Sequence, residues 1–383
     1  MKIALIIERM DASRGGRETS TAQIAAELAR RGQDVTILCQ QGSLDGAGVI
    51  VKQLGNRGAG RCKKLTNFIA DVEGETKTWR YHIVHAMLPI PSANVYQPRG
   101  GTIPGQFAAS LRRRPAMVRP LLKLFNPLNR CRAMLGKLER QIMANPRTIA
   151  LAVSDMVAAE FKRFYGRKDN VRMIYNAADV PDPIADQRAQ WRKQLRAKLN
   201  VAEGDAVFLT IATNFALKGV AQTIESFARF YHSQRGDRTA RLVIVGRTMP
   251  EGYQRHASLR DVGPMVAFVP PTADIFQWYA AADACVLLSW YDPCSRVLLE
   301  AARWGVPSLT TAFNGATELL GEGCIVVDSP RARRPIVEAL DALADPRRRE
   351  VRSRACLKVA PQLSVERHVD GLLEAYAKAP PRS

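Results

Sequence analysis

Short apolar runs alternate with segments of helical periodicity along most of this chain. The first half opens with an apolar run at residues 2–8, a helical pattern at 19–31 and a second apolar run at 34–39. A strand, a helix and a further strand in succession form the repeating unit of a parallel sheet. Because such strands are buried on both faces, helices must cover both sides of the sheet.

The second half repeats this alternation more regularly. Apolar runs and helical patterns follow one another at 206–213, 220–234, 241–246, 265–269, 274–283, 284–290, 295–305, 306–311 and 323–327. The two series predict the α/β fold class, with two Rossmann-like, doubly wound domains that face each other across a cleft. Ligands of such sheets bind at the carboxyl ends of the strands, so this cleft is the expected site.

A stretch rich in proline and acidic residues separates the two series at 176–187. Its composition is typical of a linker, which predicts one domain at 1–177 and a second domain at 178–361. A final helical pattern begins at Ser364. We expect this C-terminal segment, 362–383, to pack back on the first domain.

The chain is strongly basic. Its 383 residues include 56 Lys and Arg against 36 Asp and Glu, which gives a formal net charge of +20. Such an excess suggests a polyanionic partner, either nucleic acid, an anionic membrane or a phosphate-bearing substrate. The plainer alternative is a basic proteome, in which much of this charge is solvated surface.

Cysteine usage and hydropathy indicate the cellular compartment. The seven cysteines are odd in number and include no C-x-x-C pair, which favours free thiols in a reducing compartment over disulfides or a zinc site. The apolar run at the start is too short for a secretory signal or a membrane span. These features predict a cytoplasmic protein that can still lie on a membrane surface.

Two acidic residues follow one of the apolar runs. Asp292 and Glu300 flank the start of the helical pattern 295–305, and Pro293 is expected just inside the helix start. The N–H groups of a helix start favour an anion or sugar hydroxyls, and two carboxylates on one helix face can accept hydrogen bonds from a polyol. The pair therefore predicts a site for hydroxyls and phosphate. Taken singly, Asp292 could equally be a helix cap and Glu300 a surface residue.

Two further loops carry candidate phosphate-binding groups. Lys218 lies in the loop 214–219, and Gly15 and Gly16 lie in the loop 13–18 after the first apolar run. Paired glycines let the backbone approach a phosphate closely. Taken alone, a lysine at a helix start is more often solvated surface, and paired glycines are often only a flexible turn. Both interpretations therefore depend on the surrounding sequence.

The spacing Asp292-x7-Glu300 resembles the E-x7-E block of the retaining glycosyltransferases of family 4, which have the GT-B fold. Further segments extend the resemblance over nearly the whole chain: 13–18, 153–166, 171–180, 214–219, 301–307 and 313–318. Residues 93–101, residues 214–220 and the basic middle of the chain are similar to the lipopolysaccharide core glucosyltransferases of this family.

The resemblance implies a role for each residue of these blocks. Glu300 would bind the nucleotide ribose, and Asp292, which replaces the usual Glu, would touch the donor sugar. The main-chain amides of Cys294 and Ser295 would contact the sugar or the diphosphate, whose charge Lys218 would neutralise. Lys218, Asp292 and Glu300 are also the predicted catalytic residues. The predicted donor-binding set is completed by Asn214, Gly15 and Gly16.

The implied reaction needs a leaving diphosphate whose negative charge is stabilised by a metal or by fixed cations and amides. The sequence has no D-x-D motif, so we expect Lys218 and helix-start amides to suffice, with no metal and no cofactor. The resemblance implies transfer with retention of configuration. In that chemistry the departing phosphate helps to deprotonate the acceptor, and no protein nucleophile is required.

Two residues of the first domain are further candidates for the reaction. His85 lies at the carboxyl end of a predicted strand, where it could act as a base or orient a substrate, although a lone histidine is more often structural. Arg99 stands in a region where relatives carry a His or Asp near the reacting sugar. Because a guanidinium cannot serve as a base, Arg99 would instead hold an acceptor phosphate.

The segment 111–147 is both basic and amphipathic. It contains ten Lys or Arg and one acid, Glu139, interleaved with Leu, Met and Phe. On anionic lipid each basic residue adds about 1 kcal/mol of attraction. The segment could equally bind a phosphorylated saccharide, or form a solvated helix pair with snorkelling arginines. We favour contact with a membrane or a lipid acceptor, through Arg112, Arg113, Arg114, Arg119 and Lys123.

Together these features predict an enzyme, a hexosyltransferase. It would move a sugar from a UDP- or GDP-sugar, bound by the second domain, to a lipid-linked saccharide bound by the first. The expected setting is lipopolysaccharide core assembly at the cytoplasmic face of the membrane, where the protein would be peripheral. The alternative within this class is assembly of another cell-surface polysaccharide or glycolipid.

Other classes of protein fit the sequence less well. A sugar-nucleotide epimerase would need several acids and histidines around the donor, and a phosphorylase would need a phosphate or cofactor-lysine signature. A nucleic-acid-binding protein would need stacking aromatics, but only 7% of the residues are aromatic and the basic middle has just Phe125. An NAD-binding protein would need G-x-G-x-x-G after the first apolar run. A basic membrane-binding protein without catalysis remains as an alternative of another class.

Overall fold

The computed structural model divides the chain into two compact units, the first formed by Met1–Ala177 with Ser364–Ser383 and the second by Ala178–Leu363. The sequence predicts domains at 1–177 and 178–361, with the segment 362–383 added to the first. The structure describes residues 1–11, 15–44, 46, 48–178, 180–182, 184–202, 204–234, 240–247 and 249–381.

The first unit is built on a seven-stranded parallel sheet. Its strands are β1 (Lys2–Ile6), β3 (Asp34–Cys39), β5 (Ile50–Gln53), β6 (Ile83–Ala86), β7 (Val95–Tyr96), β8 (Ile149–Ala152) and β9 (Val171–Met173). Their spatial order is β5-β3-β1-β6-β7-β8-β9. Ile3 of β1 pairs with Val35 on one side and with Ile83 on the other, so β1 is buried between two parallel neighbours.

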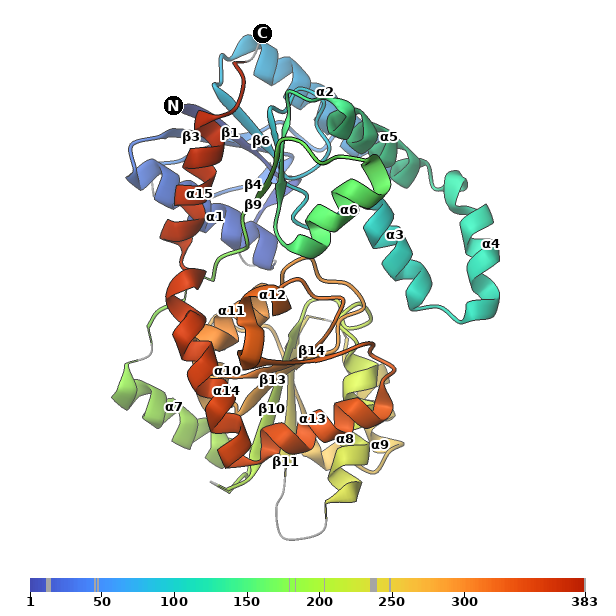
Figure 1. The fold of residues 1–383 in the computed structure, drawn as a ribbon, viewed down its shortest axis with the longest axis vertical. Helices are drawn as coiled ribbons and strands as arrows, with labels where there is room; N and C mark the ends of the chain where they lie inside the picture. Colours follow the sequence, from blue (N-terminus) through green and yellow to red (C-terminus); the bar gives the residue numbers. More distant parts are fainter. Residues whose placement is uncertain are drawn as a thin grey trace. The chain divides into compact units, whose positions relative to one another are not determined.

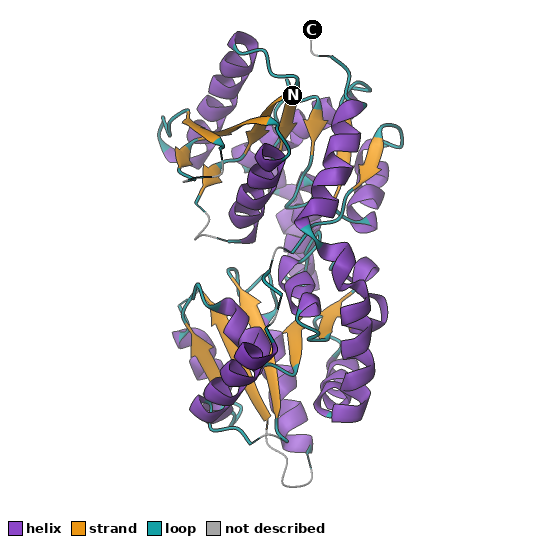
Figure 2. Cartoon of the chain, turned by 90° about the vertical axis from the view of Figure 1, so that its left-hand side faces the viewer, coloured by secondary structure: helices purple, strands orange, loops and turns teal. Residues whose placement is uncertain are grey.

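Helices cover both faces of this sheet (Figures 1 and 2). The helices of this unit are α1 (Gly16–Arg30), α2 (Gly60–Thr78), α3 (Ile103–Arg112), α4 (Arg119–Leu124), α5 (Arg130–Ala144), α6 (Asp155–Tyr165) and α15 (Val365–Ala377), of which α4 projects away from the sheet. Two short 3-10 turns, η1 (Ala116–Val118) and η2 (Asn126–Leu128), flank α4. A small two-stranded sheet pairs β2 (Arg9–Met10) with β4 (Gln41–Gly42).

The last helix of the chain packs against the first helix of the first unit. The hydroxyl of Ser364 caps α15 by accepting a hydrogen bond from the amide of Arg367 at 3.2 Å, which explains the helix start expected from the sequence. Apolar side chains of α15 share one core with α1 and the strands. An ion pair between Arg31 and Asp370 joins the two helices at the surface. The C-terminal segment is therefore part of the first unit.

The second unit repeats the design with a six-stranded parallel sheet. Its strands are β10 (Ala206–Ala212), β11 (Ala240–Gly246), β12 (Val266–Val269), β13 (Ala284–Leu287), β14 (Ser308–Thr311) and β15 (Cys324–Val327). Their order is β12-β11-β10-β13-β14-β15. All the strands are parallel, but the chain adds strands on one side of β10 first and then, from β13 on, on its other side. Loops at such a reversal splay apart and leave room for a ligand.

Helices also lie on both faces of the second sheet (Figure 2). They are α7 (Ala185–Lys198), α8 (Val220–Ser233), α9 (Glu251–Ser258), α10 (Ile275–Ala281), α11 (Arg296–Arg303), α12 (Thr317–Leu320), α13 (Arg333–Ala344) and α14 (Pro346–Val359). Helices α8 and α13 contribute to the core on one face. The last three residues of the predicted linker 176–187 belong to α7, which begins at Ala185. Asp179 and Pro183 of the linker lie outside the described residues.

The predicted fold class, two doubly wound α/β domains, is confirmed by the two parallel sheets. Each apolar run expected as a strand in the second half contains or overlaps one strand of the second sheet. Within the described parts of the chain, no helix combines the length and the hydropathy that a membrane span requires.

Candidate functional site

Three loops meet at the carboxyl ends of the central strands of the second sheet. The loop after β13 is tied to the loop after β10 by the amide of Trp290, which donates to the carbonyl of Leu217 at 2.9 Å. It is tied to the loop after β14 by the amide of Asp292, which donates to Phe313 at 2.8 Å, and by that of Gly315, which donates to Asp292 at 3.0 Å. These backbone bonds fix the three loops as one surface at the edge where such sheets bind ligands.

Lys218 and Asp292 form an ion pair on this surface. The ammonium of Lys218 contacts Oδ2 of Asp292, and the two side chains are only 20% and 9% exposed. The next residue, Gly219, has a φ of +69° and begins the approach to α8, and a Cβ there would lie 2.0 Å from the carbonyl oxygen of Leu288. Only glycine fits this backbone conformation in contact with the neighbouring loop, which places Lys218 beside Asp292.

Asn214 closes the turn that carries Lys218. Its side-chain oxygen accepts from the amide of Leu217 at 3.0 Å, and its carbonyl accepts from the amide of Lys218 at 3.0 Å. The structure therefore gives Asn214, which the sequence places in the donor-binding set, a local role in shaping the loop.

Glu300 lies in the second turn of α11 and is held by two neighbours. The hydroxyl of Tyr279, on α10, donates to Oε2 at 2.9 Å, and the guanidinium of Arg296 lies 3.2 Å from Oε1. Burial, and next the negative charge of Glu300, raise the pKa of Tyr279, so the phenol stays protonated as a donor. A carboxylate offers about four lone-pair sites, so Glu300 keeps acceptor capacity for ligand hydroxyls.

The helical pattern 295–305 contains α11, but the expected position of Pro293 just inside the helix is wrong. The sequence placed Pro293 just inside the helix and Asp292 on the same face as Glu300, but α11 begins at Arg296 with Ser295 as its cap. Before the helix, Asp292 forms a parallel bridge with Asn314, and the chain bends at Pro293 and Cys294. Asp292 is therefore neither a helix cap nor part of the helix, and its position depends on the loop after β14.

Sequence reasoning missed Asn314, whose buried side chain holds the loop after β13 in place. Asn314 is 1% exposed, and its side-chain oxygen accepts from the amides of Ser295 at 3.3 Å and Ala316 at 3.1 Å. Its amide group donates to the hydroxyl of Thr310 at 3.2 Å. The amide of Ser295, which the sequence assigns to the donor, thus donates to Asn314 here. An Asn-Gly pair after an apolar run is a turn signal that could have indicated this residue.

Two other residues of the site had no signal in the sequence. Tyr279 lies on α10 and donates a hydrogen bond to Glu300. Arg296 lies one turn before Glu300 on α11 and forms an ion pair with it. Cys294, a predicted contact of the donor, is 4% exposed in the same loop. Within the second unit the structure joins Lys218 to Asp292, and Glu300 lies on α11, the helix that follows the same loop.

The predicted glycines belong to the first unit. Gly15 precedes α1, and its carbonyl accepts from the amide of Thr19 at 3.1 Å, while Gly16 is the first residue of the helix. Ser13 and Arg14, from the same predicted loop, lie outside the described residues. The paired glycines thus stand at the helix start that follows the carboxyl end of β1.

His85 is built into the core of the first unit. Its side chain is fully buried, and Nδ1 lies 2.7 Å from the hydroxyl of Tyr376 on α15. Burial, and next the charge of Arg99, lower the pKa of His85 to about 3, so the imidazole is neutral. These contacts favour the structural alternative, in which His85 holds α15 to the sheet.

Arg99 is also largely internal. It is 6% exposed, and its guanidinium contacts the hydroxyl of Ser20 and the side-chain oxygen of Asn176, the latter at 3.1 Å. Both partners belong to the first unit, so Arg99 ties the start of α1 to the end of that unit. The predicted role in holding an acceptor phosphate stays a prediction.

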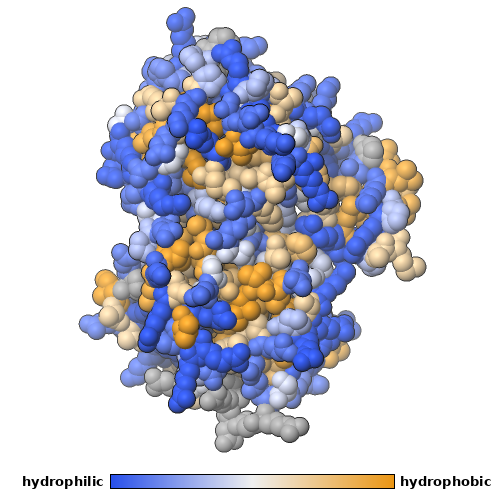
Figure 3. Space-filling model, in the orientation of Figure 1, coloured by the Kyte–Doolittle hydropathy of each residue, from blue (hydrophilic) through white to orange (hydrophobic). Residues whose placement is uncertain are grey.

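The basic middle segment forms an apolar and cationic surface around α4. Large apolar side chains stand out there, with Met117 92%, Leu124 72% and Leu128 72% exposed (Figure 3). The single acid of the segment, Glu139, is fully buried, where it accepts from Tyr96 at 2.6 Å and from Tyr165. The surface of this segment is therefore cationic without an acidic counterpart. The predicted contact residues Arg112, Arg113, Arg114, Arg119 and Lys123 all belong to α3, to α4 or to the turn between them.

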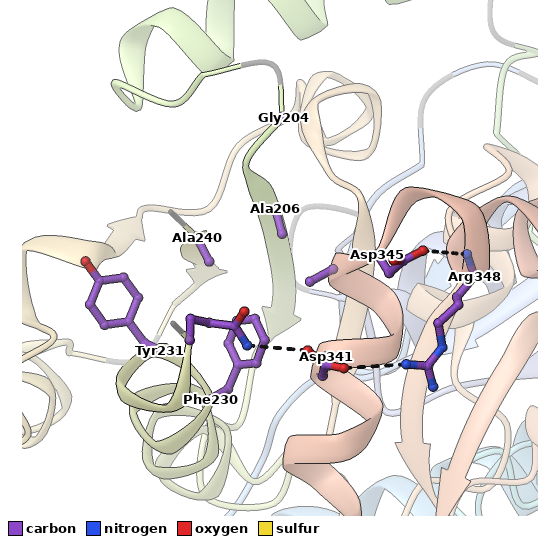
Figure 4. Close-up of a pocket in the computed structure, with 10 residues that line it drawn as sticks. Gly204, Ala206, Phe230, Tyr231, Ala240, Asp341, Asp345 and Arg348 are labelled. Atoms are coloured by element: carbon purple, nitrogen blue, oxygen red, sulfur yellow. Dashed lines mark hydrogen bonds and ion pairs between the residues drawn. The ribbon is translucent and has the colours of Figure 1, made fainter. Parts of the chain in front are cut away.

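A small pocket of about 80 Å³ lies at the opposite, amino-terminal edge of the second sheet (Figure 4). Ala206 and Ala240, the first residues of β10 and β11, line it together with Phe230. Its acid Asp341 is already in contact with Gln234 and Arg348, each at 3.4 Å. A ligand of drug or nucleotide size needs several times this volume. This pocket is therefore not the candidate site.

Comparison with known families divides the chain in the same order. Residues 14–181 match the family model for Glycosyltransferase Family 4, and residues 205–345 match the family model for Glycosyl transferases group 1. The two matches follow one another along the chain: the first covers most of the first unit and ends just inside the second, and the second lies within the second unit.

Curated relatives agree with this assignment over part of their length. The chain is 27% identical over 196 residues to lipopolysaccharide glucosyltransferase WaaG of Escherichia coli K12, which covers 50% of this chain and 52% of WaaG. It is 32% identical over 139 residues to a D-inositol 3-phosphate glycosyltransferase of Thermomonospora curvata, which covers 35% of this chain and 32% of the relative. The matched part thus spans about half of WaaG and a third of the second relative.

Solved structures show the same fold over nearly the whole chain. The crystal structure of WaaG superimposes with a TM-score of 0.82 at 20% identity, covering 98% of this chain and 99% of WaaG. Anabaena HepE in complex with UDP-glucose superimposes with a TM-score of 0.71 at 18% identity, covering 98% and 100%. The two family models identify the chain as a glycosyltransferase of family 4 type, and the solved structures show that it has the GT-B fold.

Proposed function

We propose that this chain is a retaining glycosyltransferase that moves a sugar from a nucleotide-diphosphate donor to a lipid-linked saccharide. The observation that carries the proposal is the ion pair of Lys218 and Asp292, held by three loops at the carboxyl ends of β10, β13 and β14. A cation beside a carboxylate at this edge suits a ligand with both a diphosphate and sugar hydroxyls.

The donor's diphosphate would engage Lys218. As the bond to the sugar breaks, negative charge grows on the departing phosphate, and a positioned ammonium stabilises that charge more in the transition state than in the bound donor. Asp292 would then be released to accept a hydroxyl of the sugar. Glu300, oriented by Tyr279 and Arg296, would accept the ribose hydroxyls.

UDP is the nucleotide that we favour over GDP. The support comes from the fold neighbour HepE, whose structures are complexes with UDP, with UDP and glucose, and with UDP-glucose. The match to a lipopolysaccharide glucosyltransferase favours glucose as the sugar.

Retention is supported by what the described site offers. Asp292 would be engaged with a hydroxyl of the donor sugar, and His85 is fully buried in the other unit, so neither is assigned the role of a nucleophile. The departing phosphate would itself take the acceptor proton on the face from which it leaves. Neither a metal nor a cofactor enters this scheme, because Lys218 and backbone amides meet the charge. Activity that disappears with a chelator and returns with a divalent cation would contradict it.

The acceptor would be held at a membrane. The exposed apolar side chains around α4, next to five basic residues, are what a surface of anionic lipid attracts. This supports a peripheral position at the cytoplasmic face, with the lipid-linked core of lipopolysaccharide as the acceptor. The curated relatives that act as D-inositol 3-phosphate glycosyltransferases favour a second candidate, transfer to a small phosphorylated polyol.

A transfer assay with purified protein tests the proposal. UDP-glucose and GDP-mannose are offered with either a truncated lipopolysaccharide or inositol 3-phosphate, and the anomeric configuration of the product is read by NMR. We expect transfer from UDP-glucose to the truncated lipopolysaccharide with an α-linked product, and loss of transfer in Lys218→Ala. Lys198→Ala, an exposed lysine of the same unit, is the matched control. An inverted product, or full activity of Lys218→Ala, would contradict the proposal.

A further inference from the structure

The two partly exposed cysteines of the chain lie on neighbouring helices of the first unit. All seven cysteines are among the described residues, and five of them are buried: Cys39, Cys285, Cys294, Cys324 and Cys356. The other two, Cys62 and Cys131, are partly exposed. Cys62 lies in the first turn of α2 and Cys131 in the first turn of α5. An oxidant in solution therefore reaches these two thiols before the others.

The same two thiols are also neighbours. Helices α2 and α5 pack against each other (Figure 1). One turn beyond the cysteines, Oγ1 of Thr66 lies 3.0 Å from Sδ of Met134, so these faces of the two helices meet there. The side chain of Cys131 interacts directly with that of Cys62 at the preceding turn. The fold thus brings together two accessible thiols from distant parts of the sequence.

A second pair of neighbouring cysteines shows what an unreactive pair looks like. Cys324 and Cys356 interact in the core of the second unit, where both are buried. Burial raises the pKa of each to about 12, so both remain protonated and out of reach of an oxidant. The pair Cys62 and Cys131 differs because it can be reached from solvent.

The surroundings of the accessible pair suggest an order of reaction. The guanidinium of Arg61 lies near the thiols, and a nearby cation favours the thiolate that attacks an oxidant. Burial, and next the neighbouring Cys62, raise the pKa of Cys131, so this thiol keeps its proton at neutral pH. Cys62 is therefore suited to the first attack and Cys131 to the second step.

We propose that Cys62 and Cys131 form a redox modification site, which a hydroperoxide converts into a disulfide. The thiolate of Cys62 attacks one oxygen of hydrogen peroxide, the O–O bond breaks, and the departing hydroxide takes up the thiol proton as water. The sulfur of Cys131 then attacks the sulfenic acid on Cys62. The S–S bond forms, the S–O bond breaks, and a second water leaves with the proton of Cys131. Each sulfur loses one electron and the peroxide gains both.

The disulfide would fasten α5 to α2 next to the surface around α4. Cys131 is the second residue of α5, and the turn η2 and α4 precede this helix along the chain. The crosslink closes a long loop and restricts the unfolded chain, so oxidation should raise the urea midpoint of the first unit by about 1 M. In the reducing compartment that the sequence predicts, it would form only when peroxide rises, and thiols would reverse it.

Thiol counting and peptide mapping on the full chain test the proposal. In the reduced native protein, two thiols should react with an aromatic disulfide reagent. After treatment with hydrogen peroxide none should react, and dithiothreitol should restore both. Mass spectrometry of a chymotryptic digest should find one crosslinked pair of peptides, which contain Cys62 and Cys131 and have lost two hydrogen atoms.

Three variants locate the crosslink and the order of the steps. Cys62→Ser and Cys131→Ser should each abolish the crosslink and the rise in urea midpoint, and in Cys131→Ser the remaining Cys62 should be trapped as a sulfenic acid. Cys356→Ala removes a buried thiol and should keep both effects. Oxygen added to the two separate thiols of the parent chain, a crosslink between two copies of the chain, or an unchanged number of reactive thiols would contradict the proposal. The test uses neither donor nor acceptor, so its outcome is independent of the proposed function.

Discussion

The ammonium of Lys218 contacts the carboxylate of Asp292 across a sequence separation of 74 residues. The lysine comes from the loop after β10 and the aspartate from the loop after β13. These two strands are neighbours at the point where the strand order of the sheet reverses. Neither side chain has much access to water, so each charge depends on the other when no ligand is present.

This pair should show strong energetic coupling. Lys218→Met and Asp292→Asn each leave one charge or polar group unpaired, and each should lower the free energy of unfolding by about 1–3 kcal/mol. The double variant should lose less than the sum, because both partners are removed together. Urea unfolding of the four proteins measures the coupling energy. Additive losses would show that the pair does not interact in solution.

Glu300 should depend on Tyr279 for its orientation. Tyr279→Phe removes the hydroxyl that donates to Oε2, which leaves Arg296 as the partner of the carboxylate among the described residues. We expect the Kd for UDP to rise about fivefold, with a smaller effect on kcat than on KM for the donor. Tyr231→Phe, on α8 outside the site, is the control. An unchanged Kd for UDP in Tyr279→Phe would show that Tyr279 does not orient Glu300 for binding the nucleotide.

The buried His85 should make the first unit sensitive to acid. Its pKa of about 3 in the fold lies below its ordinary value of 6.5, so the unfolded chain binds more protons between these values. Stability is therefore present above pH 6.5 and declines as the pH falls, by about 2 kcal/mol between pH 7.5 and 5. Burial, and next the charges of Arg99 and His368, lower this pKa and keep the imidazole neutral.

His85→Gln should flatten this part of the stability curve. Chemical denaturation at several pH values compares it with the parent chain and with His232→Gln, which changes an exposed histidine. The difference between pH 7.5 and 5 should shrink in His85→Gln only. An identical pH profile in all three proteins would show that His85 is accessible to protons in the fold.

The surface around α4 should bind anionic vesicles. Replacing Arg112, Arg113 and Arg114 by Gln should lower the affinity for phosphatidylglycerol vesicles by about a hundredfold, since each cation contributes about 1 kcal/mol. Sedimentation with the vesicles measures this affinity. An equal loss of charge at the exposed Arg334, Arg347 and Arg354 of the second unit should have little effect. Equal weakening by both sets would indicate attraction to net charge, and not a defined membrane surface.

The fold was predictable because its strands are continuous apolar runs. The run 34–39 coincides with β3, and the helix expected from Ser364 begins one residue later with Ser364 as its cap. Both signals are local, in hydropathy and in cap chemistry, and both sheets bury their strands as such runs require. The spacing Asp292-x7-Glu300 likewise pointed to the loop after β13 and to α11, on which these two residues lie.

The geometry of that site was less predictable. The turn Tyr291 to Ser295 looked like a helix start because Pro293 suits that position, but Asp292 pairs with Asn314 in a bridge and α11 begins only at Arg296. The roles of Asn314 and Tyr279 depend on contacts between elements far apart in the sequence, which local patterns do not contain. The ion pair of Lys218 and Asp292 is of the same kind.

The central claim, that Lys218 meets the diphosphate of the donor and Glu300 meets its ribose, is tested most directly by comparing the affinities of UDP and uridine in variants of these two residues. The parent chain should bind UDP much more tightly than uridine. Lys218→Ala should abolish most of that difference, while Glu300→Ala should weaken both ligands alike and Lys198→Ala neither. A Lys218→Ala protein that still prefers UDP as strongly as the parent chain would contradict the account.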